Sequence, residues 1–389
     1  MPDEFRSFRV LREISESTTI TSFYLEPADG AALWPVKPGQ YLTLKVPTDA
    51  APVFKTYSVS SDPSETPFYR ISVKREARPE PDLPDGVGSC WLHDTVEVGS
   101  EIEVAAPRGV FVLDEDCTHP VILLSGGVGI TPLLSMLHRL VGSRRDVWFI
   151  HACEDGDVHA MHNEVRALVE TGDVPLCAYT LYRTPTDADR AAKHHDAEGV
   201  IDKAFLQSVL PMDDYDVYMC GPTPFMVAMY RLLIELGVPK ARIAYEFFGK
   251  ASSLESLAAP TVVPSSKAAS NATKAVASLA FLTDPDAWAV PDKLAVAEPV
   301  NGSPSGGDVT FQNSQVTVEW NSPAGSLLEL AEDAGLNPDF SCRAGICNTC
   351  SCTLIQGEVE YFEEPLTTPE PGKVLICCSR PKGRVVLDI

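Results

Sequence analysis

The chain has 389 residues, which is too many for one compact domain and enough for two or three domains of ordinary size. Its 31 Lys and Arg against 54 Asp and Glu give a formal charge of −23, which disfavours a sequence-independent affinity for nucleic acid or anionic lipid. No apolar run reaches membrane-spanning length and the start lacks the features of a signal peptide, so we expect a cytoplasmic globular protein that binds neither nucleic acid nor a membrane.

Residues 1–114 are predicted to form an antiparallel β-barrel or sandwich. Short segments of alternating apolar and polar residues are separated by Gly, Pro and Asp turns, which is typical of half-buried antiparallel strands. The predicted strands are 8–14, 21–27, 41–47, 56–61, 68–75 and 101–107.

Residues 115–250 show a different pattern, in which apolar strands alternate with helices. This alternation predicts a parallel, doubly wound α/β sheet. Thr131 and Thr223 are expected to cap two of the helices, and Gly142 and Gly237 to end them. The predicted strands and the helices that follow them are 121–125 with 131–142, 147–152 with 162–170, and 216–220 with 222–237.

The remaining chain divides into a linker and a small domain. Residues 251–307 are rich in Ala, Ser, Pro and Lys and poor in large apolar residues, which predicts a tether. Residues 308–389 contain strand-like segments, one helical segment and a cysteine-rich loop, which indicate a small α+β domain.

The cysteine-rich loop carries the strongest motif in the chain. Cys342, Cys347 and Cys350 have the spacing C-x4-C-x2-C, and two more thiols follow at Cys377 and Cys378. Thiolates at this spacing with one distant partner favour a 2Fe-2S cluster, whereas a zinc ribbon would need paired C-x2-C knuckles. The last eighty or so residues thus resemble a plant-type ferredoxin domain of β-grasp fold. The resemblance implies that Cys377 is the fourth ligand and that Cys378 is not one.

Two turns in the α/β region suggest a nucleotide site. The first, a glycine-rich turn between a strand and a helix, would let backbone approach a pyrophosphate, although by itself it also fits a plain strand-to-helix turn. The second follows a later strand at the same edge of the sheet, and two such turns make a cleft. The residues of the two turns are Gly126, Gly127, Gly129, Thr131, Cys220, Gly221 and Pro222.

With these turns, the segment TYSV and the segment YEFFG, residues 1 to about 250 resemble the ferredoxin-NADP reductase superfamily. The resemblance implies that Thr56, Tyr57 and Ser58 lie at a flavin, and that Cys220 lies near a nicotinamide. The family's arginine is Lys55 here, which supplies charge to a flavin phosphate without a bidentate fork.

The choice of flavin also depends on resemblance. The segment GVGSCWLHD is similar to the phosphate-binding turn of flavohaemoglobin reductases, which implies FAD rather than FMN. YEFFG is similar to the end of the same module, where an acid and an aromatic residue lie beside the flavin ring. Val73 and Lys74 resemble an adjoining flavin strand, although they also fit an ordinary barrel strand. The implied flavin residues are Gly86, Val87, Gly88, Ser89, Glu246, Phe247 and Phe248.

The expected activity combines these modules. An acidic segment after the second α/β strand, HACEDGD, disfavours a 2′-phosphate and favours NADH, although Arg183 lies farther along. We therefore expect electrons to pass from NADH through FAD and a 2Fe-2S cluster to an external acceptor, with Ser58, Cys220 and Glu246 at the reacting centre. The resemblance implies a terminal Rieske oxygenase as the acceptor. A di-iron oxygenase, hybrid-cluster protein, a role as a redox sensor and a stand-alone flavin reductase remain alternatives.

Overall fold

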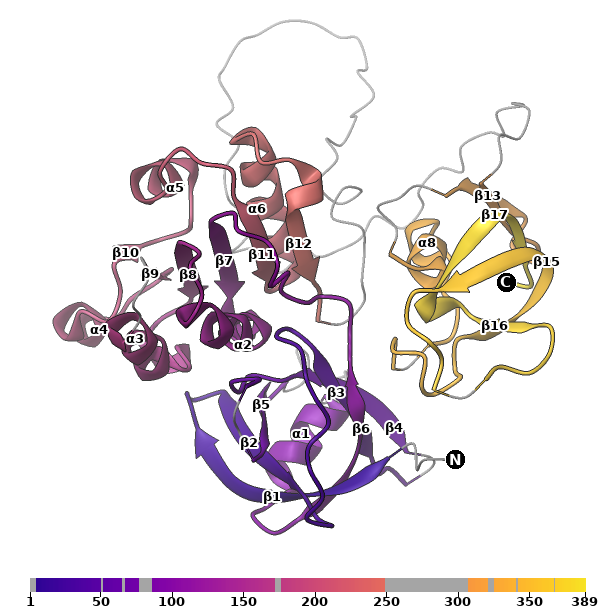
Figure 1. Cartoon of the computed structure of the whole chain (residues 1–389), viewed down its shortest axis with the longest axis horizontal. Coiled ribbons are helices and arrows are strands. Elements are labelled where there is room, and N and C mark those ends of the chain that lie inside the picture. Colours follow the sequence, from indigo (N-terminus) through magenta and orange to yellow (C-terminus); the bar gives the residue numbers. More distant parts are fainter. Residues whose placement is uncertain are drawn as a thin grey trace, which may run out of the picture.

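The computed structural model describes nine stretches of the chain and divides them among three sheets (Figure 1). The predicted linker at 251–307 lies outside the described residues except for Gly307. In the part of the chain that is described, no helix combines the length and the apolar character needed to cross a membrane. The described stretches are 5–49, 52–64, 67–76, 86–171, 176–248, 307–320, 325–340, 342–366 and 368–389.

The N-terminal region is a six-stranded antiparallel sheet in the order β4-β3-β6-β1-β2-β5. A bridge between Val59 and Ile71 joins the two edges, which closes the sheet into the predicted barrel. The same region contains one named helix, α1 (Val87–Asp94), which lies between β5 and β6 in the sequence. The strands are β1 (Arg6–Ser15), β2 (Ile20–Pro27), β3 (Tyr41–Val46), β4 (Val53–Ser58), β5 (Tyr69–Lys74) and β6 (Glu101–Arg108).

The second sheet is parallel, in the order β10-β9-β8-β7-β11-β12. Alternate residues of β7 (Val121–Gly126) enter two separate apolar cores, which contain α2 (Ile130–Val141) and α6 (Thr223–Glu235) respectively. Helices therefore cover both faces, as predicted. The other elements are β8 (Val147–Cys153), α3 (His162–Thr171), β9 (Leu176–Tyr182), α4 (Asp187–Ala192), β10 (Ala197–Glu198), α5 (Lys203–Val209), β11 (Asp216–Cys220) and β12 (Ile243–Glu246).

Both predicted helix caps in this domain are wrong by one or two positions. A short turn, η1 (Gly127–Gly129), runs directly into α2, so Thr131 lies inside the helix and its hydroxyl donates to the Val128 carbonyl. Thr223 is the first residue of α6 because Pro222 already takes the capping position.

The C-terminal domain is a mixed five-stranded sheet in the order β14-β13-β17-β15-β16. Its central pair, β13 and β17, is parallel and the other pairs are antiparallel. Helix α8 (Leu327–Asp333) packs its leucines into the core beside the cysteine-bearing segments. The strands are β13 (Asp308–Phe311), β14 (Val316–Glu319), β15 (Ser351–Tyr361), β16 (Lys373–Leu375) and β17 (Ser379–Leu387).

One buried ion pair joins the barrel to the α/β domain. Arg70 of β5 donates from both terminal nitrogens to Glu164 of α3, at 2.6 and 2.8 Å, and His138 of α2 lies 2.6 Å from the same carboxylate. Burial alone would raise the pKa of Glu164, but the hydrogen bonds from His138 and Arg70 lower it to about 2. The carboxylate is thus ionised and shared between three elements.

Candidate functional site

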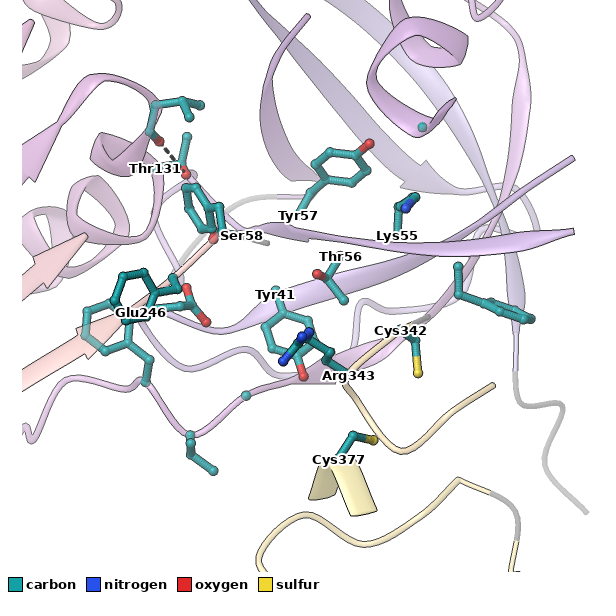
Figure 2. Close-up of a pocket in the computed structure, with 18 of the residues that line it drawn as sticks. Tyr41, Lys55, Thr56, Tyr57, Ser58, Thr131, Glu246, Cys342, Arg343 and Cys377 are labelled. Carbon is teal, nitrogen blue, oxygen red and sulfur yellow. Dashed lines mark hydrogen bonds between the residues drawn. The ribbon is translucent and has the colours of Figure 1, made fainter. Parts of the chain in front are cut away.

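A cavity of about 730 Å³ lies where the three domains meet. Figure 2 shows Ser58, Thr131 and Glu246 at one end of it and the thiols of Cys342 and Cys377 at the other. The barrel contributes one wall through β4, the α/β domain contributes the segment after β12, and the ferredoxin-like domain contributes its cysteine loop. Residues predicted from three separate motifs therefore line one space.

The barrel wall is formed by β4 and the start of α1. The segment predicted as a phosphate-binding turn, 86–89, is the first turn of α1, with Gly86 at the capping position and no acidic residue in that turn. A Cβ on Gly88 would lie 2.6 Å from Lys55 Cγ and 2.7 Å from Tyr57 Oη, so a larger residue would displace these two side chains of β4. The free backbone amides of such a helix start suit a phosphate.

The two glycine-rich turns of the α/β domain touch each other at the carboxyl edge of β7 and β11. A Cβ on Gly129 would lie 2.1 Å from the carbonyl oxygen of Cys220, which means that the two backbones are in direct contact. Gly127 instead has φ +52° with open space beside it, so its backbone is accessible. Because β7 and β11 are parallel neighbours at the point where the strand order reverses, this edge is where such sheets bind ligands.

Cys220 is less accessible than its predicted role suggests. It is fully buried, it does not line the cavity, and it pairs with Glu246 across β11 and β12. Burial and then the neighbouring Glu246 raise the pKa of this thiol well above its ordinary value, so the group is a neutral thiol. The predicted contact between Cys220 and a nicotinamide stays a prediction.

The cysteine loop has the backbone geometry of a sulfur cradle. The sulfur of Cys342 accepts amide hydrogen bonds from Ala344, Ile346 and Cys347 at 3.3 to 3.4 Å. Gly345 takes φ +64°, and a Cβ there would lie 2.9 Å from the sulfur of Cys378, so the tight turn requires glycine. Amides that point at sulfur lower the free-energy cost of holding a negatively charged cluster.

The four predicted ligands lie together. Cys342 is hydrogen-bonded to Cys347, and Cys350 to Cys377. The Cys378 thiol donates to the Leu375 carbonyl, at 3.7 Å, and also interacts with the thiol of its neighbour Cys377. A set of four thiols beside inward-pointing amides fits a 2Fe-2S cluster, and the choice of Cys377 rather than Cys378 as the fourth ligand stays a prediction.

Comparison with known families gives one match for each region. Residues 8–113 match the oxidoreductase FAD-binding domain, residues 123–231 the oxidoreductase NAD-binding domain, and residues 309–382 the 2Fe-2S iron-sulfur cluster binding domain. The flavohem-like FAD/NAD-binding domain of nitric oxide dioxygenase from Vibrio cholerae O1 biovar El Tor is 36% identical, with a TM-score of 0.56, over 63% of this chain and 98% of that one. The chain belongs to the ferredoxin-NADP reductase superfamily.

Two other proteins are similar to this chain over different lengths. The flavohemoprotein of Bacillus thuringiensis subsp. konkukian is 43% identical over 256 residues, which are 65% of this chain and 63% of that protein, so the chain spans less than two thirds of that relative. Phthalate dioxygenase reductase, described as a modular structure for electron transfer from pyridine nucleotides to [2Fe-2S], aligns with 100% of this chain and 98% of its own at a TM-score of 0.51 and 24% identity. The latter likeness concerns the fold, including all three domains.

The chain thus carries domains of the FAD-binding, NAD-binding and 2Fe-2S families, and polar side chains of the cavity fit a flavin. Among the described residues, Ser58 Oγ and Glu246 Oε2 are buried without a hydrogen-bond partner although both residues line the cavity. Buried polar atoms are nearly always paired, so these two atoms suit a bound group that can form hydrogen bonds, as a flavin ring can. Burial, and next the charge of Glu363, raise the pKa of Glu246 to about 8.

The structure divides the predicted flavin and nucleotide residues into two groups. Those that line the cavity are Lys55, Thr56, Tyr57, Ser58, Val73, Lys74, Gly86, Val87, Gly88, Ser89, Thr131, Glu246, Phe247 and Phe248. Those that lie at the sheet edge outside it are Gly126, Gly127, Gly129, Cys220, Gly221 and Pro222. Their individual roles stay predictions, and the placement agrees with one flavin site adjoining one dinucleotide site.

Sequence reasoning missed three residues that line the cavity between the barrel and the cysteine loop. Tyr41, Gly109 and Glu363 belong to no motif, and they meet only because distant parts of the chain fold together. Gly109 alone gave a signal, because a glycine directly after a strand, here with φ +116°, often marks a close approach.

Proposed function

We propose that the protein is an NADH-dependent reductase that passes electrons through FAD and its 2Fe-2S cluster to a terminal oxygenase, and that this oxygenase alone sets the substrate. One observation carries the proposal: Ser58 and Glu246 of the flavin site line the same cavity as Cys342 and Cys377 of the cluster loop. A flavin site and a cluster site that line one cavity are arranged for direct electron transfer.

Three cofactors divide the chemistry, since a flavin accepts a hydride and releases electrons singly, and an iron-sulfur cluster carries one at a time. The chain itself supplies positioning and proton control. Glu246 has a pKa of about 8, so below this pH its carboxyl is neutral and its Oε2 can hold a proton. The unpartnered Ser58 Oγ can hydrogen-bond to a bound ring.

An anaerobic titration with NADH tests the internal route. We expect flavin absorbance to bleach and a rhombic electron paramagnetic resonance signal of a reduced 2Fe-2S cluster to develop as NADH is added. A cluster that stays silent while the flavin is reduced, or a metal content of zinc, would contradict the route.

The preference for NADH is supported by the carboxyl edge of β8 and β9. Glu154 accepts hydrogen bonds from the Arg183 Nε, at 2.7 Å, and from the Thr184 hydroxyl. The arginine that a 2′-phosphate would need is therefore already neutralised, and a carboxylate beside it repels that phosphate. We expect Glu154→Gln to raise the ratio of kcat/KM for NADPH over NADH about tenfold. An unchanged ratio would show that this edge does not select the nucleotide.

A Rieske oxygenase is the proposed acceptor. Support comes from the shared domain order with phthalate dioxygenase reductase and from the charge of residues 308–389, which hold twelve acids against five bases, or −7. An acidic carrier suits a basic docking surface. The test compares NADH-driven reduction of a purified Rieske oxygenase, a di-iron oxygenase and a hybrid-cluster protein. Faster reduction of either alternative would replace the Rieske oxygenase as the acceptor.

A redox sensor or a bound electron-transfer subunit is the second reading from the sequence. Such a protein would show little steady NADH oxidation with any acceptor, whereas the reductase should turn over.

All eleven cysteines are free of disulfides, which supports a reducing compartment such as the proposed cytoplasm.

A further inference from the structure

We propose that Glu363 is a positioning residue that fastens the ferredoxin domain to the flavin domain and thereby sets the separation between the flavin and cluster sites. It lies just after β15, and both of its carboxylate oxygens are used by the barrel. The Gly109 amide donates to Oε1 at 3.0 Å, and the Tyr41 hydroxyl donates to Oε2 at 3.3 Å. One side chain thus bridges β3 and the end of β6 to the ferredoxin domain.

Tyr41 places this contact directly between the two redox sites. Its side chain is partly buried and interacts electrostatically with Glu363, with Glu246 of the flavin site, and with Cys342 and Cys377 of the cluster loop. Burial is the first cause that raises the pKa of the tyrosine well above its ordinary value, and the interactions with these four groups add to it. Tyr41 therefore keeps its proton and acts as the donor. Figure 2 shows it between Glu246 and the two cysteines.

A backbone feature makes the contact possible. Gly109 has φ +116°, and a Cβ there would lie 2.9 Å from the Tyr41 ring. A side chain at this position would push the ring away and move the amide that binds Glu363. The tyrosine, the glycine and the carboxylate thus form one unit.

Arg108 adds a second connection, which reaches the cluster loop itself. Its Nη1 donates to the carbonyl of Glu364 at 2.7 Å and, at the longer distance of 3.4 Å, to the carbonyl of Ala344. Ala344 lies between the ligands Cys342 and Cys347, so the loop is tied to the end of β6. The two connections thus use consecutive barrel residues, Gly109 for Glu363 and Arg108 for the cluster loop.

The interface also has an apolar part, which is not directional. Its buried members are Ala105 from the barrel and Cys342, Ala344 and Ile346 from the loop, and Phe5, Phe54 and Leu366 pack against them partly buried. Apolar contacts favour docking in proportion to the area that they bury, but they do not fix one geometry. The charge-assisted hydrogen bonds to Glu363 add the directional contacts that fix the docked position.

The test compares Glu363→Ala with Glu364→Ala in the full holoprotein. The two variants remove the same charge and the same atoms from adjacent positions, but the Glu364 side chain is exposed and only its carbonyl contacts the barrel. After rapid anaerobic mixing with NADH, the measured quantity is the rate of cluster reduction relative to the rate of flavin reduction. We expect this ratio to fall about tenfold in Glu363→Ala and to keep its wild-type value in Glu364→Ala, because hydrogen bonds to a charged group are lost from the docked state only in the former.

A second readout does not depend on electron transfer. Hydrogen exchange of the peptide that contains Gly109 should speed up in Glu363→Ala and stay unchanged in Glu364→Ala. Tyr41→Phe, which removes one oxygen, should change both readouts in the same direction by less. Wild-type exchange and wild-type cluster reduction in Glu363→Ala would overturn the proposal, and so would equal slowing of flavin and cluster reduction, which indicates a general loss of structure.

Discussion

The nucleotide edge and the cluster loop solve similar electrostatic problems with different parts of the chain. Both are placed to hold negatively charged groups. At the edge of β7 and β11 the groups that would hold the ligand belong to the backbone, because Gly129 touches the Cys220 carbonyl and Gly127 faces open space. In the cluster loop they are side chains, whose sulfurs accept amide hydrogen bonds. The first kind of site is damaged by adding one carbon, and the second by exchanging one atom.

The largest effect is expected from Cys342→Ser, which exchanges sulfur for oxygen at one ligand. A hydroxyl is a poor substitute for a thiolate toward iron-sulfur clusters, so we expect iron content to fall almost to zero. FAD content and flavin reduction by NADH should persist, because the flavin site lies on the other domain. Iron analysis and the visible spectrum measure both.

Cys378→Ser is the matched control for this exchange. The Cys378 thiol donates to the Leu375 carbonyl and the resemblance gives it no ligand role, so iron should remain at the wild-type level. If Cys378→Ser lost as much iron as Cys342→Ser, the assignment of Cys377 as the fourth ligand would be wrong.

A smaller effect is expected from adding one carbon at the nucleotide edge. In Gly129→Ala the new Cβ would meet the Cys220 carbonyl, and backbone on both sides must move. We expect KM for NADH to rise about tenfold and the free energy of unfolding to fall by about 2 kcal/mol. Steady-state kinetics and denaturant unfolding measure these changes.

Gly142→Ala provides the comparison for this variant. Gly142 follows α2, has a negative φ and has open space beside it, so alanine should be tolerated with wild-type KM. A similar rise of KM in both variants would mean that the contact between the two turns is unimportant for nucleotide binding.

The smallest effect concerns the buried carboxyl at the cavity. The pKa of Glu246 is raised to about 8 from an ordinary value of 4.5, so the native state holds a proton that the unfolded state has lost in this range. Its contribution to stability is therefore full below pH 4.5 and is lost as pH rises through 8. We expect the unfolding midpoint of Glu246→Gln, measured on flavin-free protein, to gain roughly 5 °C on wild type between pH 5 and 8.

Glu358→Gln, at an exposed strand position, should follow the wild-type pH profile throughout. A Glu246→Gln profile parallel to that of wild type would show that this carboxyl is ionised in both states.

Sequence patterns predicted the features that depend on local structure, such as strands and ligand spacing. The barrel strands follow the alternation of apolar residues, and the cysteine spacing located a loop whose thiols do lie together. Strand β9 was not predicted, because only its ends are buried and its apolar pattern is broken. Segment 86–89 was taken as a turn, although its glycines begin the helix α1.

The contacts between domains could not be predicted from the sequence. Tyr41 looks like an ordinary strand residue, and Glu363 is one of many acids in an acidic chain. Their meeting depends on how two domains dock across 322 positions of sequence, which no local spacing encodes. Glu246 was predicted as a site residue through the family resemblance, but the burial of its Oε2 without a partner could not be, because it arises only in the folded cavity.

The shared carboxylate of Glu164 has a consequence for how this architecture can be rebuilt. Arg70 from the barrel and His138 from α2 both bind it, so the two domains carry their own internal fastening. Removing one member of such a pair destabilises the folded state, so the pair keeps the barrel and the α/β domain together as one unit. An engineer could therefore exchange the iron-sulfur module for another electron carrier and leave the alignment between flavin and nucleotide intact.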